Sequence, residues 1–551
     1  MSGTRHRVVL QARMSSTRLP GKVLLPLCNL PVVVLAARRA ARDGIETVVA
    51  TSDDSGDDQL AETLQQYGIR HVRGPLDDVL ARFIAATADL DDGDICVRLT
   101  SDNVFPDSDF VHRLIEAGGG NGEGYSGFAG GADGLPYGLA GEAIRVGLLR
   151  EADRATQDAH DREHVTPWII RKCGRQTPTF PRVDEVDLSH LRCTIDTLDD
   201  YRNVHAALSG LANPVAAPWQ ELCRRLTRWS ERAQPFVPAR IVSGELQASL
   251  VLGGAQFGLN YGIANSTGKP GDDALHAILD LAERHGLSHL DTAAGYGDSE
   301  HRIGSALAPE SPLQIVTKLP PNLLDGQPPP AEAAQRTHVA LDRSFWLLGR
   351  SRIDAILLHR FEHYRGSEGA VWRTILSYKL DGRIRRAGAS VYQPDELVAL
   401  LQDPEVGLVQ IPFNILDRRW RDPEVQQAIA ARPDVILHGR SALLQGLLTI
   451  DDPGQWPVSD RNLAAGCIDT LKSLTQRLGR ENVIDLCFAY ARAQSWLAGI
   501  VVGAETAAQM ADNIRLFQAP ALTPDQIQAV ESALPGALPE QLLNPALWPR
   551  R

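Results

Sequence analysis

The sequence predicts an α/β protein with two domains, a parallel sheet covered by helices followed by a (β/α)8 barrel. Three observations support this fold class. The chain has 551 residues, which exceeds the roughly 100–200 residues of one typical domain. The first 230 residues alternate short apolar runs with helical periodicity. From residue 250 onward a second series of apolar runs begins, as a (β/α)8 barrel requires.

The elements of the first domain follow a strand–helix rhythm. Val8–Ala12 is a short apolar run typical of a buried parallel strand. Leu30–Arg42 and Gln59–Tyr67 have helical periodicity, whereas Glu46–Ala50 and Asp94–Leu99 read as further strands. This alternation predicts a parallel sheet with helices on both faces.

Runs of glycine, proline and apolar residues predict a loop, the domain boundary and the strands of the barrel. The glycine-rich stretch Gly119–Gly138 predicts a mobile loop near the site. Residues 236–247 are expected to link a domain of residues 1–235 to one of residues 248–551, because prolines cluster there. The eight predicted barrel strands are Leu250–Gly253, Ser288–Leu290, Gln314–Thr317, Ala355–Leu358, Arg385–Ala389, Leu408–Gln410, Val435–Leu437 and Gly499–Val502.

The composition narrows the class of partner. A net charge of −12, without a basic tract, argues against nucleic acid. Apolar runs are too short for membrane insertion. The seven cysteines stand singly, which favours a reducing, cytoplasmic setting over disulfides or a zinc site. We therefore expect small-molecule substrates, and the sequence leaves a homo-oligomer open.

Polar residues follow three successive predicted barrel strands. Asp291 ends one strand, with Tyr296 in the loop after it, Lys318 ends the next and His359 the third. The carboxyl ends of barrel strands converge on one mouth, where barrel enzymes carry out their chemistry. A tyrosine beside a lysine that is held by an aspartate would protonate a carbonyl oxygen, with the lysine lowering the tyrosine pKa. A nicotinamide must supply the hydride.

This half of the chain resembles the aldo/keto reductases from Leu250 to Phe517. The resemblance implies a catalytic tetrad with Tyr296 as the general acid/base, Lys318 as its pKa tuner, Asp291 as the lysine partner and His359 as the substrate orienter. It also implies NADP or NAD as cofactor. The implied cofactor contacts are Ser390 and Gln410 for the nicotinamide amide, Ser441 for a phosphate, and Asp512 and Asn513 for the adenine.

Several positions depart from the aldo/keto reductase pattern. Val391 replaces a frequent asparagine, and Arg440 replaces the aromatic residue beneath the nicotinamide. The basic pair that binds the 2′-phosphate of NADP aligns with Gly503 and Gln509. Without charge-assisted contacts to that phosphate, NAD becomes the alternative cofactor.

The most specific motif of the first domain is Gln11–Leu24, directly after the first predicted strand. Backbone N–H groups of this loop, with Arg13, Arg18 and Lys22, would hold a triphosphate, although the motif is not a Walker A sequence. Two aspartates, Asp102 and Asp196, each end a later strand. Such hard carboxylates suit Mg²⁺ bridged to substrate phosphates.

These motifs resemble the cytidylyltransferases of the spore-coat-polysaccharide type and the CMP-KDO and CMP-acylneuraminate synthetases, over residues 6–210. The resemblance implies a Rossmann-like nucleotide-diphospho-sugar transferase fold that uses CTP and Mg²⁺. It assigns Arg13, Ser15, Arg18 and Lys22 to the nucleotide, and Asp102 and Asp196 to the metal. The chain departs from the pattern at Ala140, where an aspartate is usual, and at Asn103 and Val104, where a Cys-Pro pair is usual.

The leading hypothesis is a bifunctional enzyme of surface-glycan biosynthesis, combining cytidylyl transfer to a sugar with oxidoreduction of a carbonyl or alcohol. The departures at Ala140 and Asn103 motivate an alternative, a reductase with a non-catalytic nucleotide-binding or assembly module. A third hypothesis, a pure binding protein, is disfavoured by the set Tyr296, Lys318 and His359.

Overall fold

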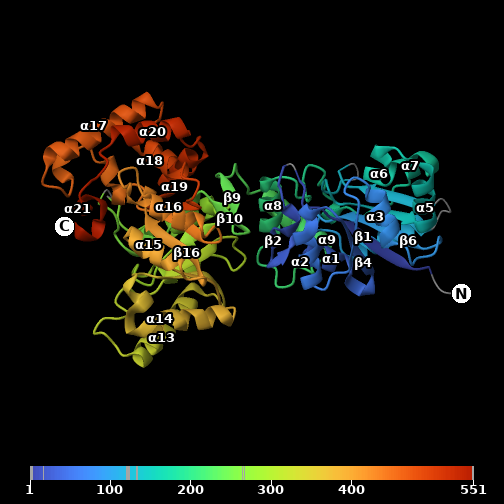
Figure 1. Cartoon of the computed structure of the whole chain (residues 1–551), viewed down its shortest axis with the longest axis horizontal. Helices are drawn as coiled ribbons and strands as arrows, with labels where there is room; N and C mark the ends of the chain where they lie inside the picture. The colour runs from blue at the N-terminus through green and yellow to red at the C-terminus, as the bar shows by residue number, and fades with distance from the viewer. Residues whose placement is uncertain are drawn as a thin grey trace. The chain divides into compact units, whose positions relative to one another are not determined.

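A computed structural model describes residues 4–16, 18–119, 124–131, 134–263, 265 and 267–548 (Figure 1). The chain divides into two compact units, residues 1–232 and 233–551. Both units belong to the α/β class, and the predicted fold class is confirmed. In the described part of the chain no helix is long and apolar enough to cross a membrane.

The N-terminal unit is built on a six-stranded sheet in the order β5-β4-β1-β6-β8-β7. The first four of these are parallel, and β8 and β7 pair antiparallel at one side. Val8 and Val9, which point to opposite faces of β1, are both fully buried because helices cover both faces. The strands are β1 (His6–Gln11), β4 (Glu46–Ser52), β5 (His71–Gly74), β6 (Ile95–Thr100), β7 (Tyr125–Ala129) and β8 (Ala140–Arg145), with the short pair β2 (Pro26–Leu27) and β3 (Leu30–Pro31) beside them. The helices are α1 (Val32–Ala40), α2 (Asp58–Gln66), α3 (Val79–Ala86), α4 (Ser108–Gly119), α5 (Val146–Ala155), α6 (Ala159–His164), α7 (Pro167–Cys173), α8 (Leu198–Leu208) and α9 (Trp219–Ser230).

The stretch Gly119–Gly138, expected to be one mobile loop, contains strand β7. Tyr125 and Phe128 are buried there, and burial of these rings outweighs the surrounding glycines. Residues 120–123 and 132–133 of the stretch lie outside the described residues.

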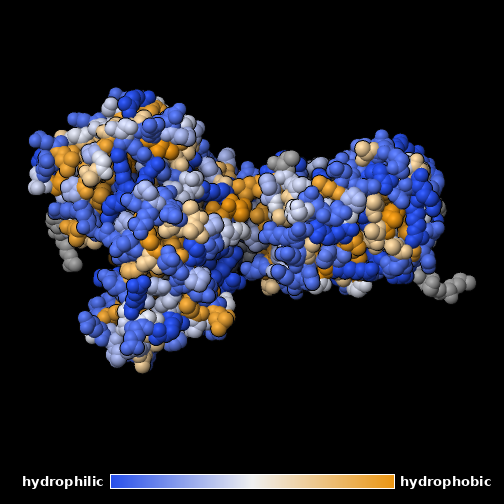
Figure 2. Space-filling model, in the orientation of Figure 1, coloured by the Kyte–Doolittle hydropathy of each residue, from blue (hydrophilic) through white to orange (hydrophobic). Residues whose placement is uncertain are grey.

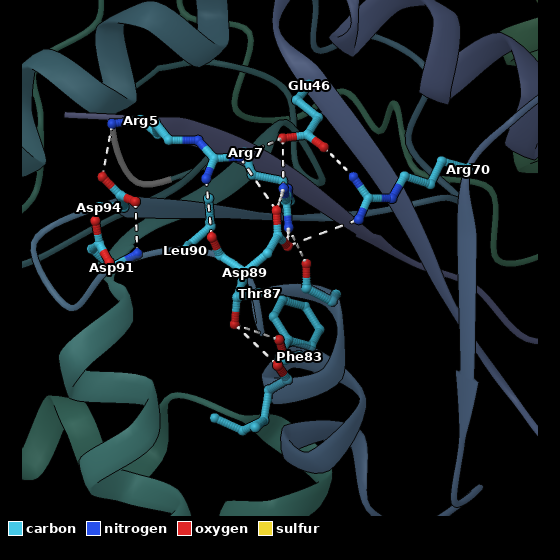
Figure 3. A network of polar contacts seen from close by, with 12 residues as sticks. Arg5, Arg7, Glu46, Arg70, Phe83, Thr87, Asp89, Leu90, Asp91 and Asp94 are labelled. Carbon is cyan, nitrogen blue, oxygen red and sulfur yellow. Dashed lines mark hydrogen bonds and ion pairs between the residues drawn. The ribbon is translucent and has the colours of Figure 1, made fainter. Parts of the chain in front are cut away.

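A buried arginine, Arg7, connects the amino end of β1 to the end of α3 and to β4 by hydrogen bonds (Figure 3). The Arg7 guanidinium is fully buried and donates to Asp89 Oδ1 at 2.6 Å, to Glu46 Oε2 at 2.7 Å and to the carbonyl oxygen of Ala86 at 2.7 Å. These bonds hold the pKa of the Asp89 carboxyl well below its usual range. The network joins β1, β4 and the segment after α3, opposite the edge that carries the nucleotide motif.

The C-terminal unit is a closed barrel of eight parallel strands. Its strands are β11 (Leu250–Gly253), β12 (His289–Asp291), β13 (Gln314–Lys318), β14 (Ile353–Leu358), β15 (Ile384–Ser390), β16 (Val406–Pro412), β17 (Ile436–Arg440) and β18 (Gly499–Gly503). The helices are α10 (Ala255–Gly258), α11 (Asp272–Arg284), α12 (Ser299–Ala306), α13 (Pro330–Leu348), α14 (Glu362–Leu380), α15 (Pro394–Leu401), α16 (Pro423–Ala430), α17 (Arg461–Arg477), α18 (Val483–Arg492), α19 (Ala507–Gln518), α20 (Pro524–Ala533) and α21 (Glu540–Leu543). The face seen in Figure 2 is mostly hydrophilic, as expected when the apolar residues form the cores.

The expected linker, residues 236–247, contains most of an antiparallel hairpin formed by β9 (Ala239–Val242) and β10 (Glu245–Ala248). The buried Glu245 carboxylate pairs with Arg386, near the amino end of β15. Gln247 is fully buried, and its Oε1 lies 3.1 Å from His438 Nε2. Because the partners of these buried polar residues lie in distant barrel strands, the sequence pattern alone does not mark the hairpin as a packed element.

Two buried histidines in the barrel predict a loss of stability in acid. His289 and His438 are 2% and 0% exposed, and their ring centroids lie 5.2 Å apart. Burial lowers the pKa of His438 to about 3 and also lowers that of His289. In the unfolded chain both titrate near 6.5, so the unfolded state gains protons first as the pH falls. Stability should fall from pH 6.5 downward, and His438 alone should contribute about 2 kcal/mol of this loss at pH 5.

Denaturant unfolding of the barrel transition at pH 7 and pH 5 measures this effect. In His438→Gln, the decrease in unfolding free energy between the two pH values should be smaller by about 2 kcal/mol. An equal decrease in the variant would assign the acid sensitivity to other groups.

Candidate active sites

The reductase-like site is a cavity of about 340 Å³ at the carboxyl ends of the barrel strands. Asp291 and Tyr296 line it from β12 and the following loop, and Arg440 and Ser441 line it at the end of β17. Gly503, at the end of β18, lines its other side. The barrel geometry places these chain-distant residues together because all parallel strands end on the same face.

Lys318 is the centre of a polar cluster whose members Asp291 and Tyr296 line this cavity. Its buried ammonium donates to Asp291 Oδ1 at 2.6 Å, to Asp291 Oδ2 at 2.8 Å and to the carbonyl oxygen of Thr292 at 2.9 Å. The Tyr296 hydroxyl lies 3.5 Å from the same nitrogen. His359 faces Tyr296 edge-on, with ring centroids 5.8 Å apart. All four predicted tetrad residues therefore meet at one point.

The protonation states in this cluster differ in part from the sequence expectation. Burial, together with the Asp291 charge, raises the pKa of Tyr296 rather than lowering it. Burial is the larger of these two causes, because it disfavours the charged phenolate. The Lys318 ammonium is paired with Asp291. Burial and the nearby Lys318 charge lower the pKa of His359 to about 3. The site thus holds a protonated phenol beside a neutral imidazole at physiological pH.

Two buried side chains near the cluster, Gln410 and Ser390, present polar atoms that a ligand could contact. Gln410 is fully buried and donates from Nε2 to Asp291 Oδ1 at 2.6 Å, which leaves Oε1 without a partner among the described residues. Its strand neighbour in the β15–β16 register, Ser390, is also buried. An acceptor and a hydroxyl side by side fit a carboxamide, which offers an N–H₂ donor and a carbonyl acceptor. These residues therefore fit the nicotinamide that the family implies.

Two of the three remaining predicted cofactor residues line the cavity. Ser441 and Asn513 line the cavity, whereas Asp512 is exposed and is not among the lining residues. A side chain in place of Gly503 would collide with Gln256, since an added Cβ would lie 2.1 Å from Gln256 Oε1. Glu505 also lines the cavity and brings an acidic group to it.

The nucleotidyltransferase-like site is centred on Lys22, whose buried side chain emerges from the loop after β1. Gly21 adopts the left-handed conformation (φ 69°), which turns the chain into the short 3-10 helix that starts at Lys22. The Lys22 ammonium donates to Asp102 Oδ2 at 2.8 Å and to Asp196 Oδ1 at 3.1 Å. Two carboxylates that are 94 residues apart thus meet around one cation.

The other predicted nucleotide residues surround this pair less tightly. Arg18 is exposed and lies 3.1 Å from Asp196 Oδ1, and Arg192 contacts Asp196 Oδ2 at 3.0 Å. Arg13 is half-buried and Ser15 is exposed, on the same loop. The loop after β1 therefore brings two cations, Arg18 and Lys22, to the carboxylate of Asp196.

The chemistry of this donor set fits the implied metal. In the described residues no group of three or more His, Cys, Asp or Glu side chains is placed to hold a metal ion. Magnesium, however, commonly takes only one or two carboxylates and completes its shell with waters and substrate phosphates. Asp102 and Asp196 supply that number of ligands, with Lys22 between them as a countercharge.

Arg82 is a candidate nucleotide contact that the sequence analysis missed. It is fully buried on α3, and its Nε and Nη1 atoms have no hydrogen-bond partner among the described residues. Burial, and then the nearby Arg13 charge, lowers its pKa. Its position on the apolar face of a helix hides it in the sequence. The local signal is the segment of residues 73–82, which ends at Arg82 and supports the resemblance to the cytidylyltransferases without assigning this arginine a role.

The departures from the family pattern lie close to a second polar cavity. Asn103 is buried and hydrogen-bonds the Gly138 carbonyl oxygen, which ties the segment after β6 to the start of β8. Ala140 lines a cavity of about 450 Å³ with Arg98 and Glu142. This cavity also contains His160, His164, Thr166 and Arg175. The segment Asp161–Pro167 thus contributes to a cavity wall as well as to helix capping.

The folds and sites define two enzyme classes, a nucleotidyltransferase and a barrel oxidoreductase. Residues 7–198 match the model of the family described as cytidylyltransferase, and residues 249–535 match that of the aldo/keto reductase family. The chain belongs to both families, to each through the corresponding domain.

Three similar proteins illustrate this division. The spore coat polysaccharide biosynthesis protein SpsF of Bacillus subtilis is 34% identical over 212 residues, which cover 36% of this chain and 84% of that protein. The uncharacterized oxidoreductase YqkF of Bacillus subtilis is 25% identical over 273 residues, covering 46% of this chain and 86% of that protein. A cytidylyltransferase structure from Leptospira borgpetersenii has 25% identity and a TM-score of 0.37, covering 41% of this chain and 96% of that one.

Proposed function

We propose that the chain is a bifunctional enzyme of surface-glycan biosynthesis. The N-terminal domain transfers a cytidylyl group from CTP to a sugar with the help of Mg²⁺, and the barrel carries out NAD(P)-dependent carbonyl or alcohol oxidoreduction. The observation that carries the reductase half is the cluster of Tyr296, Lys318, Asp291 and His359. The observation that carries the transferase half is the meeting of Asp102 and Asp196 at Lys22.

In the reductase reaction, Tyr296 donates its phenolic proton to the substrate oxygen as negative charge develops there. The Lys318 ammonium, held by Asp291, stabilises the resulting phenolate. Neutral His359 can donate a hydrogen bond to the same oxygen and so orient the carbonyl. A nicotinamide held by Ser390 and Gln410 supplies the hydride when bound.

In the transferase reaction, the cations of the loop after β1 hold the triphosphate and offset its charge. Arg13, Arg18 and Lys22 act there, and Ser15 adds a hydroxyl. Magnesium on Asp102 and Asp196 supplies Lewis-acid stabilisation when bound. The acceptor sugar occupies the 450 Å³ cavity beside Arg98 and Glu142.

The pattern at the far side of the barrel cavity favours NAD over NADP. Gly503 and Gln509 offer no cation for a 2′-phosphate, and the Glu505 carboxylate would repel one. Glu505 accepts a hydrogen bond from Thr267 Oγ1 at 3.0 Å and its backbone N–H donates to Gln509 Oε1 at 2.7 Å, so its position is defined.

Removing the Glu505 charge should therefore shift cofactor preference. In Glu505→Gln we expect the ratio of the NADPH Kd to the NADH Kd to fall by about tenfold, a change of ~1.4 kcal/mol. Fluorescence titration with each reduced cofactor measures the ratio. Glu481→Gln, which removes a surface charge paired with Arg515, is the matched control. An unchanged ratio in Glu505→Gln would show that the 2′-phosphate of NADPH does not bind near Glu505.

The alternative is a reductase with a non-catalytic nucleotide-binding or assembly module. Ala140, in the wall of the proposed acceptor cavity, is the observation that favours it. Pyrophosphate release from CTP with KDO or N-acetylneuraminate as acceptor separates the two. Release above the level without acceptor supports transfer, and CTP binding without release from any sugar acid supports the alternative.

A further inference from the structure

Arg440 introduces a positive charge at the catalytic end of the barrel cavity. Its Nε donates to Ser390 Oγ at 3.2 Å, and its Nη2 donates to the carbonyl oxygen of Val391 at 3.1 Å. Its guanidinium carbon lies 4.2 Å from the ring centroid of Tyr392. One aromatic face and two hydrogen bonds thus hold the group in place, and the side chain lines the cavity.

The charge of Arg440 is not balanced locally. Lys318 and Asp291 neutralise one another as a buried pair, whereas no carboxylate forms an ion pair with Arg440 in the described part of the chain. The Arg440 charge reaches the catalytic groups, because it contributes to the lowered pKa values of both Lys318 and His359. The catalytic end therefore has a net positive charge.

The position of a bound nicotinamide relative to Arg440 follows from two constraints, and this step rests on the proposed function. A carboxamide that hydrogen-bonds Ser390 Oγ must lie beside Arg440, whose Nε contacts that same oxygen. The ring must also reach the carbonyl carbon of a substrate whose oxygen contacts the Tyr296 hydroxyl. Tyr296 lines the same cavity as Arg440. Between these points, a bound ring would lie against the side chain of Arg440.

We infer that Arg440 makes this site discriminate between the two redox forms of the cofactor, favouring the reduced form. The oxidised ring is a pyridinium cation and is repelled by the guanidinium. The reduced ring is uncharged and electron-rich, so its face attracts the same cation. A cation at this position thus favours an enzyme loaded with NADH.

The test is equilibrium binding of NADH and NAD⁺ to the full chain by calorimetry, which requires no substrate and no turnover. For the unaltered protein we expect NADH to bind at least about tenfold more tightly than NAD⁺. In Arg440→Met, which keeps an unbranched apolar stem, the ratio of the NAD⁺ Kd to the NADH Kd should fall toward one. In Arg440→Lys, which keeps the charge, most of the ratio should remain.

The outcomes separate the inference from the proposed function. Equal affinity for both forms in the unaltered protein, or an unchanged ratio in Arg440→Met, overturns the redox discrimination but leaves the reductase assignment standing. Binding of neither form overturns the proposed cofactor and the inference together. Thermal unfolding of each variant identifies a folding defect, and Arg440→Lys then provides the comparison that separates charge from packing.

Discussion

Tyr296→Phe is expected to lower kcat for carbonyl reduction by about a thousandfold while leaving cofactor affinity unchanged. The variant removes only the hydroxyl that lies 3.5 Å from Lys318 Nζ. General acid catalysis of this kind typically contributes about 10²–10⁴-fold. The raised pKa of the phenol means that it is protonated over the whole physiological range, so the loss should be independent of pH between about 6 and 8.

The measurement is NADH oxidation followed by absorbance with a panel of sugar carbonyl substrates, paired with calorimetric NADH binding. Tyr364→Phe is the matched control, because Tyr364 lies on α14 and is not among the residues that line the cavity. Its hydroxyl donates to Asp403 Oδ2 at 2.8 Å. Turnover that persists in Tyr296→Phe at the level of the control would show that another group donates the proton.

Asp102→Asn is expected to reduce Mg²⁺-dependent pyrophosphate release by about a hundredfold or more. The substitution preserves the size of the side chain but removes one of the two carboxylates that accept hydrogen bonds from Lys22. With a single carboxylate left, the metal loses both a ligand and its charge balance, and CTP binding should lose most of its dependence on Mg²⁺.

Asp92→Asn is the matched control, since Asp92 pairs with Arg150 at the exposed surface. Calorimetric CTP titration with Mg²⁺ and with EDTA provides a readout that needs no acceptor. A variant that keeps the full magnesium dependence of CTP binding and the full rate of pyrophosphate release would exclude Asp102 as a metal ligand.

Local pattern was sufficient to predict much of the fold and the positions of the candidate catalytic residues. Buried parallel strands are short apolar runs, and such runs end at Asp291, Lys318 and His359. Because strand ends converge in a barrel, residue type and position together predicted the cluster. The same logic placed Lys22 and Asp102 at one edge of the first sheet.

Other features depend on contacts that the local sequence does not encode. The hairpin of β9 and β10 is stabilised by distant partners, such as Arg386 for Glu245. Arg82 reads as a helix residue, and only its burial reveals two unpaired nitrogens. Arg440 was recognised as a departure from the family pattern, but its bond to Ser390 spans 50 residues and appears only in the structure.

Both domains are proposed to act on nucleotide ligands, CTP in the N-terminal domain and a nicotinamide cofactor in the barrel. Calorimetric titration of the full chain with CTP, ATP, GTP and UTP, each with Mg²⁺, tests this proposal most directly. The account predicts one CTP site per chain, at least about tenfold selective over the other triphosphates and weakened in Asp102→Asn. No binding of any triphosphate would contradict the account and would leave a reductase that carries a non-catalytic N-terminal module.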